Sequence, residues 1–156
     1  MSPRAALRLE TLGFEQVYDY VPGKADWLAH GLQREGRNAQ QRTAGDVAQR
    51  DVVTCGLADD VDDVRRAIAS SPYGFALVLG PNSVVLGRVR ASSTGRSVED
   101  AMEPGPSTIR PDTALDLAAR TMSEHDLKTM IVTNPEGQLM GVVRREKAQA
   151  PPEVIG

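Results

Sequence analysis

The sequence contains an internal repeat with a period of 54 residues, which constrains the fold more than any other feature. The stretch at residues 84–90, VVLGRVR, returns at residues 138–144 as QLMGVVR. The same offset, applied without a gap, aligns identical residues in both copies: Asp46 with Asp100, Thr54 with Thr108, Asp62 with Asp116, Arg66 with Arg120, Val78 with Val132, Pro81 with Pro135 and Gly87 with Gly141. Such a period predicts two copies of one supersecondary unit that are packed against each other.

Each copy has the same order of predicted elements. In the first copy, we expect a short strand at 51–55, a helix from the acidic cluster at 59–63 to about residue 70, and a hairpin of strands at 75–79 and 84–90. In the second copy, we expect a short helix at 97–102, a strand at 107–110 and a helix that begins at Pro111–Asp112. A hairpin at 129–133 and 138–144 follows, and then a last helix at 145–148. The predicted class is α+β.

The first 36 residues lie outside the repeat. Apolar residues with helical spacing predict a helix at 5–12 that ends at Gly13, and residues 17–21 suit a strand. A second helix at 24–32 has Trp27 as the expected anchor of its apolar face. We therefore divide the chain into a helix-strand-helix segment at 1–36, a polar linker at 37–42 and repeats at 43–96 and 97–150.

Composition excludes several classes of function. The net charge of -3 and the pI of about 5.4 do not favour nucleic acid as a partner. The longest apolar runs, at 75–79 and 84–86, are far shorter than the ~20 residues that a membrane helix needs. The only cysteine, Cys55, cannot form an intrachain disulfide, so we expect a cytoplasmic protein.

No arrangement of residues with catalytic or metal-binding spacing is present in the sequence. The only histidines, His30 and His125, have no cysteine nearby. The acidic cluster at 59–63 is better explained as a favourable helix N-terminus than as a metal loop. Cys55 has no positioned histidine, which favours a buried, inert thiol. We therefore expect no metal and no enzymatic activity.

Residues 12–20, LGFEQVYDY, with GKADW at 23–27 and Gly31–Leu32, resemble the closing segment of rhodanese-type sulfurtransferase domains. In that family the nucleophilic cysteine lies upstream of this segment. Cys55 follows the segment and has no counterpart there. The resemblance therefore implies a structural remnant that packs on the neighbouring module, and sulfur transfer is the less favoured alternative.

The two repeats resemble the cystathionine-β-synthase-type (CBS) domain, which occurs as tandem pairs called Bateman modules. The residues that carry the resemblance are DAM at 100–102, TIRPDTAL at 108–115 and NPEGQLMGVV at 134–143. The resemblance implies two β-α-β-β-α units related by a pseudo-two-fold axis. It also implies regulation by an adenosine-containing ligand bound between the units.

The sequence departs from the family at the expected ligand site. Many members have a hydroxyl residue after the last strand and an aspartate three positions later, which binds ribose. Here Arg90 and Ser93 stand at these places in the first repeat, and Arg144 and Lys147 in the second. Arginine and lysine suit a phosphate or carboxylate better than a ribose diol. The candidate ligand-binding residues are Thr54, Arg90, Ser93, Thr108, Arg144 and Lys147. The alternative for the arginines is a solvated strand end or a salt bridge to the acidic helix start.

Two functions remain open from the sequence. The first is a stand-alone regulator that binds AMP, ATP, S-adenosylmethionine or another anion and signals to a protein partner through the geometry of a homodimer. The second is a ligand-free interaction module in which the ligand site is vestigial. The family implies dimerisation through helices, and we expect the helix faces around Val64, Ile68, Ala118 and Met122 to serve it.

Overall fold

The computed structural model describes residues 3–18, 23, 27 and 41–150. The first sheet has four strands in the order β1 (Val53–Cys55), β2 (Phe75–Leu79), β3 (Val85–Arg90) and β4 (Glu103–Pro104). The second sheet has three strands in the order β5 (Thr108–Ile109), β6 (Thr129–Thr133) and β7 (Leu139–Arg144). The described helices are α1 (Pro3–Thr11), α3 (Ala44–Val47), α4 (Val61–Ala69), α5 (Val98–Ala101), α6 (Leu115–Glu124) and α7 (Arg145–Gln149).

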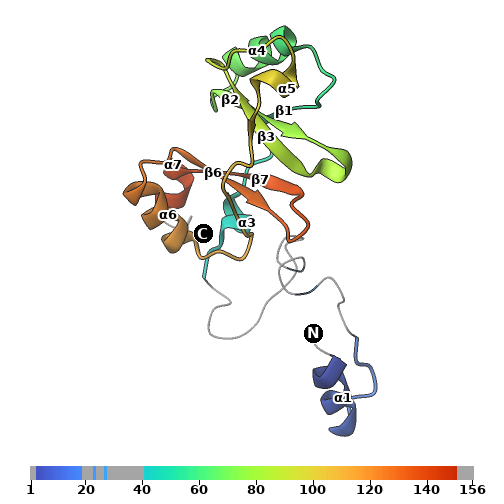
Figure 1. Ribbon diagram of the computed structural model, residues 1–156. Helices are drawn as coiled ribbons and strands as arrows, with labels where there is room; N and C mark the ends of the chain where they lie inside the picture. The colour runs from blue at the N-terminus through green and yellow to red at the C-terminus, as the bar shows by residue number, and fades with distance from the viewer. Residues whose placement is uncertain (1–2, 19–22, 24–26, 28–40, 151–156) are drawn as a thin grey trace.

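The first three strands of each sheet have the same topology, which confirms the predicted α+β repeat. In each, the first strand pairs parallel with the second, and the second pairs antiparallel with the third. We call the first sheet with α4 and α5 the first unit, and the second sheet with α3, α6 and α7 the second unit. Figure 1 shows the two units one above the other, with helices on the outer side of each sheet.

The helices that follow the first strands start for different reasons. Asp60 caps α4, because its side chain accepts hydrogen bonds from the backbone N–H groups of Asp62 and Asp63, which confirms the predicted helix start. Helix α6 begins at Leu115 rather than at Pro111–Asp112 as predicted. Ala114 forms an antiparallel bridge with Thr43, which keeps its backbone extended. A helix that began at residue 111 would break this bridge.

Each unit is completed by a segment from the other repeat. Helix α3 stands at the start of the first repeat but packs against β7 and α7 of the second unit (Figure 1). Helix α5 stands at the start of the second repeat but packs against β3, and β4 then pairs with β3. The two exchanges obey the 54-residue offset, because the bridge between Gln49 and Val142 corresponds to the pairing of Glu103 with Arg88. Each repeat therefore contributes its first segment to the unit formed by the other repeat.

Two equivalent glycines allow the exchanged segments to cross close over β7 and β3. A Cβ atom at Gly141 would lie 2.8 Å from the backbone oxygen of Gln49, and one at Gly87 would lie 2.7 Å from the backbone oxygen of Glu103. Both distances are shorter than real Cβ contacts, so no side chain fits at either position without displacing the crossing segment. The glycine of the repeated strand is therefore explained by the exchange of segments.

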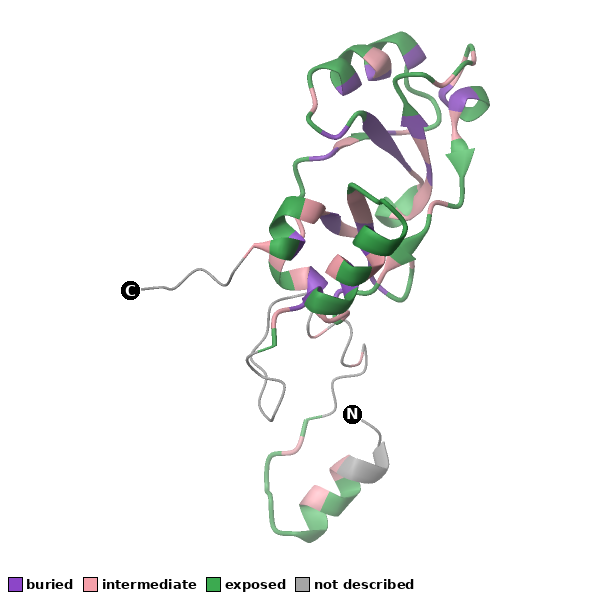
Figure 2. Ribbon diagram, turned by 90° about the vertical axis from the view of Figure 1, so that its left-hand side faces the viewer, coloured by how far each residue is buried: buried purple, intermediate pink, exposed green. Residues whose placement is uncertain are grey.

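Three apolar cores hold the structure together. One lies under α4 and α5 in the first unit, and a second lies under α3, α6 and α7. The third joins the units and contains Leu77 and Ile131, which are equivalent in the repeat. Figure 2 shows buried residues on both sheets and exposed residues on the outer faces of the helices.

The helix residues expected at a dimer interface are buried inside the units. Val64 and Ile68 are 5% and 2% exposed, and Ala118 and Met122 are 1% and 0% exposed. The expectation that these four side chains form a dimer surface is therefore wrong, because they already pack against their own sheets.

The turns of the two hairpins meet on the pseudo-two-fold axis. Val84 and Gln138, which are equivalent in the repeat, form an antiparallel bridge with each other. The N–H of Val85 donates to the carbonyl of Gly137 at 3.0 Å, and the side-chain amide of Gln138 donates to the carbonyl of Asn82 at 2.9 Å. These bonds fix the relative position of the two sheets.

The described part of the N-terminal segment forms a helix, but its apolar side chains do not pack on the neighbouring module as expected. Helix α1 ends before Gly13, whose φ of +92° suits a glycine at a helix end, as predicted. Leu7, Leu12 and Phe14 are 62%, 60% and 59% exposed, so the expected packing on a neighbouring module is wrong for these residues. Val17 and Tyr18 are not in a strand, and most of the predicted strand and second helix lies outside the described residues. None of the helices within the described ranges is long and apolar enough to cross a membrane.

Candidate functional site

The two repeated strands carry their arginines on the sides of the sheets that face each other. In β3, Arg88 and Arg90 alternate with Gly87 and Val89, which face the core of the first unit. Arg88 pairs in register with Leu77, which belongs to the core between the units. In β7, Arg144 stands two residues after Val142 of the same core. Because side chains alternate along a strand, all three arginines point toward the inter-unit side.

Arg144 is held in a closed cluster of three side chains. Its Cζ lies 4.3 Å from the ring centroid of Tyr73, and its Nη2 donates to Oδ2 of Asp51 at 3.2 Å. The Tyr73 hydroxyl donates to the other oxygen of Asp51. Burial and this hydrogen bond raise the pKa of Tyr73 above its usual value. The cluster satisfies both carboxylate oxygens and covers one face of the guanidinium.

Arg90 shares a single carboxylate with Arg88. The Nε atoms of Arg88 and Arg90 donate to Glu103 at 2.8 and 3.0 Å. The hydrogen bond from Arg88 and the charge of Arg90 lower the pKa of Glu103, which is ionised at neutral pH. This group holds two positive charges against one negative charge.

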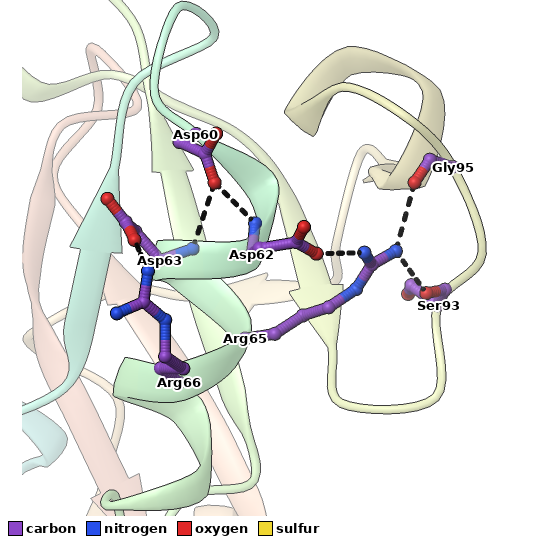
Figure 3. A network of polar contacts seen from close by, with 7 residues as sticks. All are labelled: Asp60, Asp62, Asp63, Arg65, Arg66, Ser93 and Gly95. Carbon is purple, nitrogen blue, oxygen red and sulfur yellow. Dashed lines mark hydrogen bonds and ion pairs between the residues drawn. The ribbon is translucent and has the colours of Figure 1, made fainter.

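Ser93 lies in the loop that follows β3, and Arg65 fixes this loop. The Arg65 guanidinium donates to the carbonyl oxygens of Ser93 and Gly95 at 3.1 and 3.0 Å, and Asp62 accepts from its other Nη at 2.8 Å (Figure 3). Ser93 Oγ accepts from the N–H of Arg90 at 3.1 Å. Arg65 thus connects helix α4 to the residue expected to contact a ligand.

The candidate ligand-binding residues lie in two separate places in the structure rather than in one site. Arg144 pairs with Asp51 at the entry to β1, the strand that carries the exposed Thr54. Arg90, the equivalent of Arg144 in the repeat, pairs instead with Glu103 of β4, and the exposed Thr108 lies on β5. Lys147 is exposed on α7. Arg90 and Arg144 have no partner in common among the described residues, so a single ligand held by both stays a prediction without a contact to support it.

The arginines do form ion pairs, but not with the acidic helix start. Asp62 and Asp63 pair with Arg65 and Arg66 of the same helix (Figure 3). The partners of Arg90 and Arg144 are Glu103 and Asp51 on the segments exchanged between repeats, or next to them. Sequence reasoning missed these carboxylates because the pairings depend on the exchange. Arg88 had a local signal, since it alternates with Arg90 on one strand.

Cys55 is buried in the core of the first unit. Its residue exposure is 7%, and burial together with the charge of Asp59 raises the pKa of its thiol to about 11. A neutral thiol in an apolar core is unreactive, as expected from the sequence. In the described ranges, no group of three or more His, Cys, Asp and Glu side chains is placed to hold a metal ion.

The fold defined by these two units is that of a CBS pair. Residues 98–147 match the family model described as the CBS domain. Among solved structures, CBSX2 in complex with AMP has a TM-score of 0.60 and 22% identity over 69% of this chain and 92% of its own; the CBS-pair protein CBSX2 is from Arabidopsis thaliana. The CBS domains of a transcriptional regulator from Streptococcus pneumoniae have a TM-score of 0.59 and 18% identity, over 68% of this chain and 95% of theirs.

A third similar structure belongs to a longer protein. The cytosolic domain of the Mg2+ channel MgtE in complex with ATP has a TM-score of 0.60 and 21% identity. The alignment covers 70% of this chain and 49% of that domain, so the chain spans about half of its length. No curated protein matches the sequence. The rhodanese resemblance of residues 1–36 has no support in these comparisons and stays a prediction.

Proposed function

We propose that this protein is a regulatory module in which an adenosine-containing or other anionic ligand binds between the two units. The observation that carries the proposal is the place of the arginines at the ends of β3 and β7, on the facing sides of the sheets. Guanidinium groups form strong, paired hydrogen bonds with phosphate and carboxylate. The similarity to structures solved in complex with AMP and with ATP supports an adenine nucleotide as the first ligand to test.

Binding would act on the contact between the units. The Val84–Gln138 bridge and the inter-unit core fix the angle between the two sheets. A ligand that contacts both units favours the angle at which its contacts are best, and it can shift the equilibrium only by this difference in affinity. We propose that a homodimer transmits this change to a protein partner. Light scattering that gives the mass of a monomer at micromolar concentration would contradict the dimer.

Calorimetric titration with AMP, ATP and S-adenosylmethionine tests the ligand proposal. We expect saturable binding of at least one of the three, with a rise in the unfolding temperature that depends on ligand concentration. The absence of both heat and thermal shift with all three compounds would contradict it. Low ionic strength is preferable, because salt screens exposed charges.

One observation favours a second candidate, a ligand-free interaction module. Arg90 and Arg144 already form ion pairs with Glu103 and Asp51, so an anion has to compete with an internal carboxylate. A module of this kind would bind a protein partner with the same affinity whether or not nucleotide is present. A nucleotide recovered from the purified, denatured protein would decide against it.

A further inference from the structure

The two sides of the inter-unit interface can be compared residue by residue through the repeat. We call one side the Tyr73 edge, formed by Asp51, Val52, Tyr73, Phe75, Val142 and Arg144. The equivalent residues, 54 positions away in the other repeat, form what we call the Arg88 edge: Gly105, Pro106, Leu127, Thr129, Arg88 and Arg90. The paired strands of the two edges are equivalent in register, so their side chains can be compared position by position.

The Tyr73 edge is filled by the protein itself. Tyr73 and Phe75 are 9% and 6% exposed, their rings pack edge to face with centroids 6.0 Å apart, and Val142 is 0% exposed. Arg144 lies over Tyr73, and its Nε is buried and has no hydrogen-bond partner among the described residues. The charges of Arg144 and Asp51 balance.

The Arg88 edge is more open. Leu127, which replaces Tyr73, is 36% exposed, and Thr129 replaces Phe75. Arg88 replaces the buried Val142, with 33% of its side chain exposed, and the Arg90 side chain is 45% exposed against 25% for Arg144. Because this edge has no aromatic ring at either of these two positions, its side chains fill less apolar volume than those of the Tyr73 edge.

The Arg88 edge also has an unbalanced charge. Arg88 and Arg90 both bond to Glu103 through Nε, which leaves a net charge of one positive unit. Within the described part of the chain, the Nη atoms of these two residues donate no hydrogen bond. Two guanidinium groups with free donors, held by one carboxylate, suit an added dianion such as a phosphate monoester.

We propose that the ligand binds at one edge only, the Arg88 edge, and that Arg88 and Arg90 together hold its phosphate group. This inference rests on the proposed function and sharpens it, because it assigns the site to one of two equivalent places and adds Arg88 to the binding residues. Tyr73 closes the other edge. One ligand therefore binds per chain.

Titration calorimetry of the full chain with AMP, adenosine and inorganic phosphate tests this assignment. We expect one AMP per chain, with adenosine bound at least about tenfold more weakly, because it lacks the charged group. Inorganic phosphate should compete with AMP. Arg88→Gln and Arg90→Gln should each weaken AMP binding about tenfold or more, and Arg66→Gln, on an exposed ion pair of α4, should leave it unchanged.

Further variants separate this assignment from loss of folding and from the Tyr73 edge. Arg88→Lys keeps the charge without the planar fork and should retain part of the affinity, which a folding defect would not do. Unfolding temperature is measured for every variant. Loss of AMP binding in Arg144→Gln with normal binding in Arg88→Gln, equal affinity for AMP and adenosine, or two AMP per chain would overturn the single-edge assignment but leave the proposed function intact. No binding of any nucleotide would overturn both.

Discussion

The guanidinium of Arg144 lies over the ring of Tyr73, with its Cζ 4.3 Å from the ring centroid. The two residues come from different repeats, and Asp51 bonds to both of them. This contact ties the end of β7 to the loop before β2. The equivalent positions, Arg90 and Leu127, lack it, so the pseudo-two-fold symmetry of the backbone does not extend to the side chains.

Changes at Tyr73 should separate its hydroxyl from its ring. Tyr73→Phe removes only the hydrogen bond to Asp51, and we expect a loss of about 1 kcal/mol in the free energy of unfolding. Tyr73→Ala also removes a buried ring and should cost about 3 kcal/mol or more. Urea denaturation measures both. Tyr18→Phe is the control, because Tyr18 is 79% exposed, and equal effects at the two tyrosines would contradict this account.

Alanine at the crossing glycines should destabilise the protein. Gly141→Ala places a methyl group 2.8 Å from the carbonyl oxygen of Gln49 at a φ of +153°, which residues with side chains rarely adopt. Gly87→Ala places one 2.7 Å from the carbonyl oxygen of Glu103. We expect each change to cost about 1–3 kcal/mol, as overpacking does elsewhere, measured as a shift of the urea midpoint.

Gly56→Ala is the matched control for these two glycines. The nearest atoms to a Cβ at residue 56 belong to the Asp59 side chain at 3.9 Å, which is an ordinary contact. Its effect should be close to zero or slightly stabilising. If Gly141→Ala proved as harmless as Gly56→Ala, the close crossing of residues 48–49 over β7 would be wrong.

Arg65 and Arg66 should differ sharply although each pairs with an aspartate three residues earlier. Arg65→Ala removes two hydrogen bonds to the loop carbonyls of Ser93 and Gly95, so we expect faster hydrogen exchange of the amides at 91–96. Arg66→Ala removes only an exposed pair and should leave that exchange unchanged. Mass-spectrometric hydrogen exchange makes the comparison. The same protection in both variants would show that Arg65 does not hold the loop.

Cys55 should resist thiol reagents while the protein is folded. Its pKa of about 11 exceeds the ordinary value of 9.0, so at pH 8 the folded protein has far less thiolate than the unfolded chain. The raised pKa also means that this thiol stabilises the fold below pH 9, and that its contribution is lost as pH rises from 9 toward 11. Labelling with a chromogenic disulfide at pH 8, with and without urea, measures the difference. Equal labelling rates would contradict burial of the thiol.

The sequence predicted the local parts of this fold well. The strand at 75–79 and the hairpin partners near 85–90 and 139–144 follow from apolar runs bounded by turn residues, and Asp60 signalled the start of α4. These features depend on neighbouring residues. The gapless repeat added the equivalence of the two units, which local patterns alone could not give.

The exchange of segments could not be predicted in this way. Glu103–Pro104 gave no strand signal, because the segment has only two residues and one of them is a proline. It pairs with β3 only because the start of the second repeat crosses to the first unit. The contact of Asp51 with Arg144 joins residues 93 positions apart. The candidate arginines were therefore identified from the sequence, but their carboxylate partners, and the difference between the two edges, needed the three-dimensional arrangement.

A crystal structure of the protein grown with saturating AMP tests the central claim most directly. We predict one nucleotide per chain at the Arg88 edge, with its phosphate within hydrogen-bond distance of Arg88 and Arg90 and with Tyr73 still stacked on Arg144. Nucleotide at the Tyr73 edge, with the ring displaced, would contradict the assignment of the site. Two empty edges at saturating AMP would contradict the account of the protein as an adenine-nucleotide regulator.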